Sequence, residues 1–355
     1  MRLLEIVPAL STDGVGGYAQ RLSEAFAARG TRVDLLASLQ GQEKGEILAA
    51  RTDQALDAHL QRWWEAGEEP AAVLLHYAGY GYQERGCPVW LVSGLTRWLA
   101  RGRGRRVSTF FHEVNAFGPP WRSSFWLSPL QRRLAAALAG VSYAIGTSLP
   151  IYHDVLHRWV PGREIMVLPV FSAVGEPAEA EVLPLASRPR RLVVFGGAGT
   201  RLRAFREHQA DLEAACVALD AEEVLDIGPL GADPPAAIAG RPVRRLGMLP
   251  ASELGKVLVS SMAGFLAYPP GFLPKSTVFA AYCANGMVPV CASSGRDGGP
   301  LVKGEHYLPP RPAEPLGEAE IQAVAGRARS WYMEHSLARQ MGSFLRLVFG
   351  KEDQR

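Results

Sequence analysis

The sequence predicts an α/β protein with two doubly wound halves, each a parallel sheet covered by helices. Short apolar runs alternate with helical stretches along the chain, which is typical of parallel sheets. Residues 172–190, rich in Ala, Glu and Pro, interrupt this series, and a second series starts at Arg191. With 355 residues the chain is long enough for two domains of about 150 residues each.

The first half begins with a strand, a glycine-rich turn and an amphipathic helix. From Gly17 to Ala28 the apolar residues fall on one helical face, and Arg29-Gly30 ends the helix. Further helices are expected at residues 54–66, 88–101, 124–139 and 149–158. The expected strands are Leu3–Val7, Val33–Ala37, Ala72–His76, Val107–Phe111, Val141–Gly146 and Ile165–Leu168.

The second half repeats this alternation and ends in a helical tail. Its expected strands are Arg191–Phe195, Val224–Ile227, Val243–Leu246, Ala263–Tyr268 and Val288–Cys291. Its helices are expected at residues 203–219, 251–260 and 275–285, and the tail from Glu318 to Phe349 has one apolar side. These patterns predict domains at 1–172 and 191–328, a linker at 173–190 and a C-terminal helical segment at 329–355.

Composition excludes several classes of protein. Apolar residues make up 48% and charged residues 21%, as in an ordinary globular chain. The 38 basic and 35 acidic residues leave a net charge of +3, too small for a dedicated nucleic-acid binder. The four cysteines are scattered without metal-ligand spacing, which argues against a disulfide framework and a metal site. No signal peptide or apolar run of about 18 residues is evident, so we expect a cytoplasmic protein without a transmembrane segment.

The first candidate site is the run Gly14-Val15-Gly16-Gly17, between a strand and a helix. Glycines let a ligand approach the backbone, and a helix N-terminus offers N–H groups with a partial positive charge. A phosphate or a sugar hydroxyl suits this place. The spacing lacks the third glycine of a dinucleotide fingerprint. A tight turn without a ligand is the alternative interpretation.

The second candidate is His112-Glu113, where an apolar strand ends abruptly. Doubly wound folds place ligands at the carboxyl edge of the sheet. Histidine suits hydrogen bonding or proton transfer near neutral pH, and Glu113 could orient it or bind hydroxyl groups. A histidine that merely caps a loop is the alternative.

Two further candidates lie in the second half. After Phe195, a turn containing Gly197 and Gly199 precedes Arg201 and Arg203. Guanidinium groups pair well with a diphosphate. The alternative is that either arginine faces solvent on the new helix. The other candidate is a predicted helix start at Pro274, with its first turn formed by Lys275, Ser276 and Thr277. A positively charged lysine is unfavourable at the N-terminus of a helix, where the helix dipole is also positive. A bound anion would neutralise both charges. We therefore interpret the three residues as a phosphate clamp, against a solvated surface lysine.

The pattern resembles the GT-B glycosyltransferases of the retaining, family-four type. The segments that carry the resemblance are IVPALSTDGVGGYAQRLSEAFAARGTRVDLLA, HEVNAFGPPWRSSFWLSP and AIGTSLPIYHDVL. The resemblance covers essentially the whole chain and implies two Rossmann-like domains facing a cleft, with a C-terminal helix crossing back to the first domain. It also implies that helix N-termini and cations neutralise the donor diphosphate without a divalent metal.

Individual residues follow from this resemblance. Gly16 and Gly17 match the family's glycine loop, and His112 matches the histidine that contacts the donor sugar. The family's Arg and Lys are displaced, so either Arg201 or Arg203 could be the equivalent cation. Leu273 and Ala281 occupy the places of the family's two glutamates. The candidates on the acceptor side are Asp13, Tyr18 and Asn115.

These observations predict a bacterial glycosyltransferase of polysaccharide biosynthesis that moves a sugar from a nucleotide donor to a hydroxyl acceptor. We expect it to need no cofactor, metal or nucleic acid; a peripheral membrane contact and the oligomeric state stay open. A degenerate GT-B protein that binds carbohydrate or a partner is the second hypothesis, favoured by the missing glutamates. A sugar-phosphate enzyme that uses the same anion sites is a third.

Overall fold

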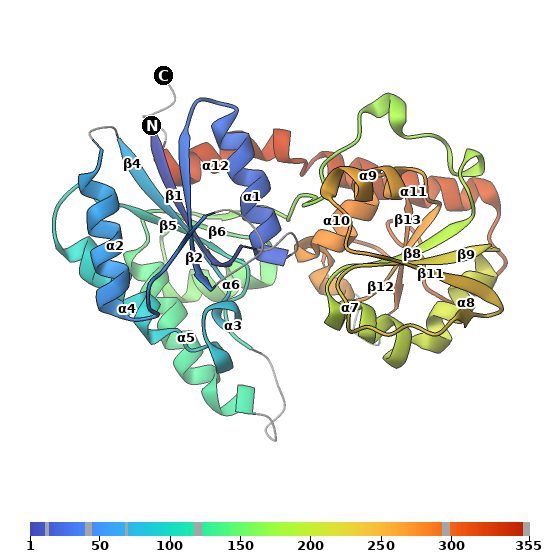
Figure 1. Cartoon of the computed structure of the whole chain (residues 1–355), viewed down its shortest axis with the longest axis horizontal. Helices are drawn as coiled ribbons and strands as arrows, with labels where there is room; N and C mark the ends of the chain where they lie inside the picture. Colours follow the sequence, from blue (N-terminus) through green and yellow to red (C-terminus); the bar gives the residue numbers. More distant parts are fainter. Residues whose placement is uncertain (11–13, 40–44, 68–69, 117–122, 293–298, 351–355) are drawn as a thin grey trace. The chain divides into compact units, whose positions relative to one another are not determined.

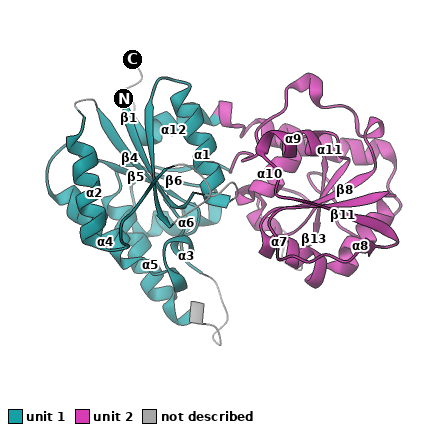
Figure 2. Cartoon of the chain, viewed as in Figure 1, with its two compact units in different colours: residues 1–169, 340–355 teal, residues 170–339 magenta. Residues whose placement is uncertain are grey.

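The computed structural model describes residues 1–10, 14–39, 45–67, 70–116, 123–292 and 299–350. The chain divides into two compact units (Figure 2). Unit 1 comprises Met1–Pro169 and Gln340–Arg355, and unit 2 comprises Val170–Arg339. Compared with the expected boundaries, the stretch 173–190 belongs to unit 2, and the C-terminal segment of unit 1 starts at Gln340.

Unit 1 contains a parallel sheet with the order β3-β2-β1-β4-β5-β6-β7 among the described residues (Figure 1). Its strands are β1 (Arg2–Ala9), β2 (Arg32–Leu39), β3 (Glu46–Ile47), β4 (Ala71–Tyr77), β5 (Val107–Phe111), β6 (Ile145–Thr147) and β7 (Ile165–Val167). The predicted parallel sheet is confirmed. The strand expected at Val141–Gly146 is wrong at its start, because Val141 still belongs to the preceding helix and β6 begins at Ile145.

Helices cover the two faces of this sheet. They are α1 (Gly14–Ala27), α2 (Asp53–Glu65), α3 (Gly79–Tyr82), α4 (Val89–Ala100), α5 (Ser123–Val141), α6 (Pro150–Trp159) and α12 (Leu337–Phe349), with a 3₁₀ turn η1 (Glu84–Gly86). The helices α2, α4, α5 and α6 contact one another in sequence along one face, while α1 and α12 lie on the other (Figure 1). Right-handed crossovers from a central β1 produce this division.

The C-terminal helix α12 returns to the sheet of unit 1, as predicted. Ser108 Oγ on β5 donates a hydrogen bond to Leu347 O at 2.6 Å, and Arg106 donates to Phe349 O at 3.0 Å. The apolar side of α12 is buried. The expected single helix from Glu318 to Phe349 is two helices, because α11 ends at Met333 and α12 begins at Leu337.

Unit 2 contains a second sheet with the order β10-β11-β9-β8-β12-β13 among the described residues, parallel except for the β10–β11 pair. Its strands are β8 (Arg191–Phe195), β9 (Glu223–Ile227), β10 (Ala237–Ile238), β11 (Arg241–Gly247), β12 (Ala263–Ala267) and β13 (Val288–Ala292). All five predicted strands are present. The edge strand β10 was not predicted, because it has only two residues.

One expected helix of unit 2 is divided, and another, α10, begins at Thr277 instead of at residue 275. The helices are α7 (Ala198–Leu202), the π-helical turn η4 (Arg203–Glu207), α8 (Gln209–Ala218), α9 (Ala251–Val259), α10 (Thr277–Ala284) and α11 (Glu318–Met333). The expected helix 203–219 is thus η4 followed by α8, separated at His208. The described residues of unit 2 also form the 3₁₀ turns η2 (Glu179–Glu181), η3 (Leu185–Ser187) and η5 (Pro270–Lys275).

Candidate functional site

His112 lies directly after β5, at the carboxyl edge of the sheet of unit 1. Its backbone N–H donates to Tyr77 O on β4 at 2.9 Å, which holds the first residue of the loop against the neighbouring strand. The residue is 8% exposed, so part of it reaches the surface. This is the place at which doubly wound sheets present ligand-binding groups.

The imidazole of His112 belongs to a hydrogen-bonded chain of three buried residues. His112 Nε2 lies 3.1 Å from His76 Nδ1, and His76 Nε2 lies 2.8 Å from Glu5 Oε2. The other carboxylate oxygen of Glu5 accepts a hydrogen bond from Ser23 Oγ at 3.0 Å. Glu5 and His76 are completely buried. We call Glu5, His76 and His112 the buried polar chain.

Strand register explains why these three residues meet. Glu5 on β1 pairs with Leu74 on β4, and alternate residues of a strand share a face, so His76 lies on the face of Glu5. His76 in turn pairs with Phe110 on β5, so His112 continues the same face. The chain therefore runs diagonally over three adjacent strands towards their carboxyl ends.

Aromatic rings from α1, β5 and α12 enclose the buried polar chain. The Tyr18 ring lies edge-on to the His112 ring at 5.1 Å and stacks on Phe110 at 5.9 Å between centroids. Phe344 of α12 lies 5.7 Å from Phe110. Burial and the negative charge of Glu5 raise the pKa of Tyr18 well above its usual value, so its phenol stays neutral. These rings replace water around the imidazoles and strengthen their electrostatic interactions.

The structure describes two of the three residues predicted on the acceptor side, Tyr18 and Asn115. Tyr18, expected on the acceptor side, is 0% exposed, and complete burial is at odds with direct contact to an acceptor. Asn115 Nδ2 donates to Ala116 O at 3.0 Å and to Ser128 Oγ at 3.4 Å, so its amide shapes the loop after β5. Gln131 on α5 holds the same loop by accepting from Ala116 N at 2.8 Å.

Glu113 lies beside His112 and is half-buried. Its backbone N–H donates to Tyr77 O at 3.3 Å. Burial, then Cys87, and then the negative charge of Glu113 raise the pKa of Tyr77. The Glu113 carboxylate therefore lies close enough to the Tyr77 phenol for an electrostatic interaction, at the same edge of the sheet.

The glycine run lies inside α1 rather than in a turn before it. The helix starts at Gly14, whose φ of +58° is a left-handed conformation that glycine adopts without strain. Gly16 and Gly17 are buried in the first turn. The predicted helix start at Gly17 is therefore three residues late. Asp13 lies outside the described residues.

The glycine turn of unit 2 brings two backbone segments close together. Gly196 has a φ of +128°, and a Cβ on Gly228 would collide with Gly196 O. Gly197 is the residue before α7, and Gly199 lies in that helix of five residues. Close approach of the β8–α7 and β9–β10 connections explains the need for glycine here.

The two arginines after this turn have different surroundings. Arg201 is 3% exposed; its guanidinium donates to both carboxylate oxygens of Asp226 and to Pro229 O. Arg203 is half-buried and donates to Ala267 O, at the carboxyl end of β12, at 3.3 Å. Arg201 is thus engaged inside unit 2, and Arg203 is the better placed of the two for an anion.

The predicted phosphate clamp has a different local structure from the one expected. Lys275 is the last residue of η5, and α10 begins at Thr277 instead of at Pro274. Ser276 is the N-cap: its Oγ accepts from Phe279 N at 3.2 Å, and the residue is 8% exposed. Lys275 is half-buried, with Nζ 5.7 Å from the Phe272 ring. Proline at 274 fits a 3₁₀ turn, which leaves the capping position to Ser276.

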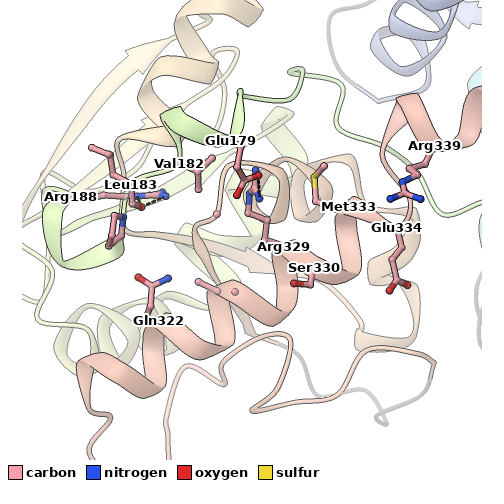
Figure 3. A pocket seen from close by; sticks show the side chains of 14 residues that line it. Glu179, Val182, Leu183, Arg188, Gln322, Arg329, Ser330, Met333, Glu334 and Arg339 are labelled. Atoms are coloured by element: carbon pink, nitrogen blue, oxygen red, sulfur yellow. Dashed lines mark hydrogen bonds and ion pairs between the residues drawn. The ribbon is translucent and has the colours of Figure 1, made fainter.

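A cavity of about 920 Å³ lies inside unit 2, between the segment 179–188 and α11 (Figure 3). Arg188, Gln322 and Arg329 are among its lining residues. Arg188 donates to Leu183 O, Ser261 O and Asn285 O. Burial, and then the charge of Arg329, lower the pKa of Arg188 to about 10. None of the predicted site residues that the structure describes lines this cavity, and the carbonyl partners of Arg188 indicate a structural role.

Sequence analysis missed Glu5 and His76. Glu5 is the one acidic residue of β1 (RLLEIVPA), and His76 is the one histidine of β4 (AAVLLHY), in strands that are otherwise mostly apolar. A charged residue in a buried strand needs a partner, and this was the available signal. Within the described ranges, no group of three His, Cys, Asp or Glu residues is arranged to hold a metal ion. No helix in those ranges is long and apolar enough to cross a membrane.

Comparison with solved structures identifies the fold. HepE of Anabaena in complex with UDP-glucose is 12% identical, with a TM-score of 0.60 over 97% of this chain and 99% of that one. A UDP-forming α,α-trehalose-phosphate synthase from Burkholderia xenovorans is 14% identical, with a TM-score of 0.61 over 98% of both chains. An α-glucosyltransferase in complex with UDP is 12% identical, with a TM-score of 0.56 over 94% and 96%. These neighbours are GT-B glycosyltransferases.

The chain has the GT-B fold. No family model and no curated protein sequence matches it. At 12–14% sequence identity, the similarity to these structures establishes the fold only. The roles of individual residues are therefore argued from the geometry of this chain. The GT-B fold does explain why predicted residues follow strands in both sheets: His112 follows β5, Gly197 follows β8, and Lys275 lies in the connection after β12.

Proposed function

We propose that the protein is a glycosyltransferase that moves a sugar from a nucleotide-diphosphate donor to a hydroxyl acceptor. The observation that carries the proposal is the buried polar chain, which ends with His112 at the carboxyl edge of a doubly wound sheet. The GT-B fold supports this choice of reaction. Solved neighbours with that fold, named as complexes with UDP or UDP-glucose, support the donor class.

Unit 1 contributes the groups that act on the sugar. His112 contacts the donor sugar, and Glu113 beside it is a candidate contact for the acceptor hydroxyl. The first four N–H groups of a helix have no acceptor within the helix, so Gly16 and Gly17 in the first turn of α1 offer backbone donors. A carboxylate at Glu113 accepts hydrogen bonds from hydroxyl groups without a change in protonation.

Unit 2 contributes positive charge for the diphosphate. Arg203 and Lys275 supply cations, and Thr277 supplies a hydroxyl in the first turn of α10. Ser276 contributes by capping α10, and Arg201 by holding the β8–α7 turn through Asp226. Backbone near Gly197 and Gly199 lets a phosphate approach closely.

The proposed mechanism is mainly electrostatic. Negative charge that develops on the departing diphosphate is stabilised by these cations and amides, and the donor–acceptor reaction needs no covalent protein nucleophile or divalent metal. We propose retention of configuration because the motifs resemble a retaining family. The substrate that accepts the sugar is a hydroxyl group of a glycan, a lipid-linked molecule or a small molecule.

The test is nucleotide binding followed by turnover. Calorimetry with UDP, GDP and ADP, each with and without EDTA, is expected to give one nucleoside diphosphate that binds equally well in both conditions. The matching nucleotide sugar is then expected to release its diphosphate when hydroxyl acceptors are added. Failure of all three nucleotides to bind contradicts the proposal, and binding that EDTA abolishes contradicts the metal-independent mechanism.

A second candidate function is a GT-B protein that binds carbohydrate or a partner without turnover. Leu273 and Ala281, at the places of the family's two glutamates, are both completely buried apolar residues. No carboxylate therefore stands at either position to hold a ribose or the donor sugar. Absence of nucleotide binding together with measurable binding to an oligosaccharide panel favours this candidate over the transferase.

A further inference from the structure

The ionisable groups of the buried polar chain leave few choices for their protons. The Glu5 carboxylate accepts from Ser23 Oγ at one oxygen and lies against His76 Nε2 at the other. An ionised carboxylate has no hydrogen to donate, so the hydrogen between the two groups is the Nε2–H of His76. In a neutral imidazole the other nitrogen is then an acceptor, and His76 Nδ1 must accept.

The same accounting fixes the second imidazole. His112 Nε2, 3.1 Å from His76 Nδ1, carries the hydrogen of that contact. Neutral His112 therefore has Nδ1 as its acceptor nitrogen. The completely buried Glu5 carboxylate thus determines the tautomer of the completely buried His76, and His76 determines the tautomer of His112, which reaches the surface. Neither Glu5 nor His76 needs to touch a ligand to have this effect.

We propose that Glu5 and His76 are positioning residues that fix His112 in the tautomer whose Nδ1 accepts a hydrogen bond from a sugar hydroxyl. The inference rests on the proposed function for the identity of the ligand, but the tautomer itself does not depend on it. In many functional sites a carboxylate accepts a hydrogen bond from the second ring nitrogen of a histidine and so fixes its tautomer and orientation. Here the His76 imidazole lies between the carboxylate and the histidine, so the arrangement spans one more strand.

Charged and aromatic groups from several elements face the buried polar chain. Among the described residues, the titratable groups that face it are Tyr18 from α1, Glu5 from β1, His76 on β4 and His112 after β5, with Glu113 next along the chain. From α12 the facing residue is Phe344, which is apolar. The negative charge that lies against His76 Nε2 therefore comes from Glu5, and a neutral amide at that position no longer dictates which nitrogen carries the hydrogen.

The first experiment observes the tautomer directly. Ring-nitrogen NMR of the full-length protein with labelled histidine covers all eight histidines, and the His112 signals are those missing from the H112Q variant. In the wild-type protein we expect Nε2 of His112 to carry the hydrogen and Nδ1 to be free of it. In E5Q, a neutral amide can either donate or accept, so we expect a mixture of both tautomers.

The second experiment measures kinetics with the donor that the binding test identifies. E5Q and H76Q are each expected to lower kcat/KM by roughly 10- to 100-fold, the usual cost of losing the partner that orients a functional histidine. A purely structural role would lower kcat/KM without changing the tautomer of His112.

The control variant is T109V. Thr109 lies on β5, completely buried, and its hydroxyl is 2.7 Å from Ser142 Oγ. Thr109 directly precedes Phe110, so its side chain lies on the face of β5 opposite to that of Phe110 and His112. The change therefore removes a buried hydrogen bond from the opposite side of the same strand. We expect T109V to lose some stability and to keep the wild-type tautomer of His112.

Each outcome decides between the positioning role and the proposed function. A wild-type His112 with its hydrogen on Nδ1, or an E5Q protein with the wild-type tautomer, overturns the positioning role even if turnover is normal. A protein that binds no nucleotide but shows the expected change of tautomer in E5Q retains the positioning role and loses the glycosyltransferase. If E5Q does not fold, H76Q provides the same NMR comparison.

Discussion

Arg201 and Asp226 form a two-point ion pair inside unit 2. Arg201 Nε lies 2.6 Å from Asp226 Oδ1, and Arg201 Nη2 lies 3.0 Å from Oδ2. Both side chains are 3% exposed. The pair joins α7 to β9, below the glycine turn that follows β8. The Arg201 guanidinium therefore stabilises the turn. Arg203 is only half-buried, so its side chain is more exposed to solvent than that of Arg201.

Replacement of Arg201 is expected to reduce stability more than replacement of Arg203. Arg201→Met leaves the Asp226 carboxylate buried without its cation, which costs roughly 3–5 kcal/mol. Arg203→Met removes one backbone contact at 3.3 Å and is expected to cost about 1 kcal/mol or less. Urea denaturation followed by circular dichroism measures both. Equal losses in the two variants would contradict the division of roles between these arginines.

Lys275→Ala is expected to weaken binding of the nucleotide without unfolding the protein. Lys275 is half-buried at the end of η5, and loss of one charge-assisted contact to a phosphate reduces affinity by about tenfold. Calorimetry with the nucleotide that binds the wild-type protein provides the measurement. Lys256→Ala, an exposed lysine on α9, is the matched control. Identical dissociation constants for the Lys275 variant and the wild type would exclude the clamp.

His112→Ala is expected to affect turnover more than nucleotide binding. Loss of the imidazole removes the contact to the sugar and is expected to lower kcat by about 100-fold or more. The nucleoside diphosphate lacks that sugar, so its dissociation constant should change by less than about threefold. His157→Ala, an exposed histidine on α6, controls for removal of an imidazole. Wild-type rates in His112→Ala would remove His112 from the site.

Asp57 makes the stability of unit 1 depend on pH. Arg101 donates to both carboxylate oxygens, at 2.7 and 2.6 Å, and lowers the pKa of Asp57, although burial acts in the opposite direction. A lowered pKa in the folded state stabilises the fold above the unfolded pKa of about 3.9, and this contribution is lost as the pH falls through the folded value. Asp57→Asn should therefore have a lower urea midpoint than the wild type at pH 7, with the gap closing in acid.

The control for this pH dependence is the second ion pair between α2 and the end of α4. Asp53 pairs with Arg97 at 2.7 Å, and these side chains are 23% and 47% exposed. Exposed pairs contribute little because water screens them. Asp53→Asn should change the urea midpoint only slightly at either pH. A gap for Asp57→Asn that persists unchanged in acid would contradict the assigned cause.

Local sequence patterns predicted most of the elements, because apolar periodicity and glycine or proline signals act over a few residues. The strand β5 and the position of His112 after it followed from such a pattern. Element boundaries were less predictable. The start of α10 depends on which residue caps it, and the start of α1 depends on which glycine adopts the left-handed conformation. Neighbouring residues of the same types could have filled either position.

The sequence by itself determined two parallel α/β halves, a C-terminal helix that returns to the first, and a histidine at the end of a buried strand. The tertiary structure alone decided which residues stand behind that histidine. Glu5 lies 71 residues from His76, and His76 lies 36 residues from His112. Their contact depends on strand order and register, which no short stretch of sequence encodes, because many distant segments together set the lowest free energy of packing.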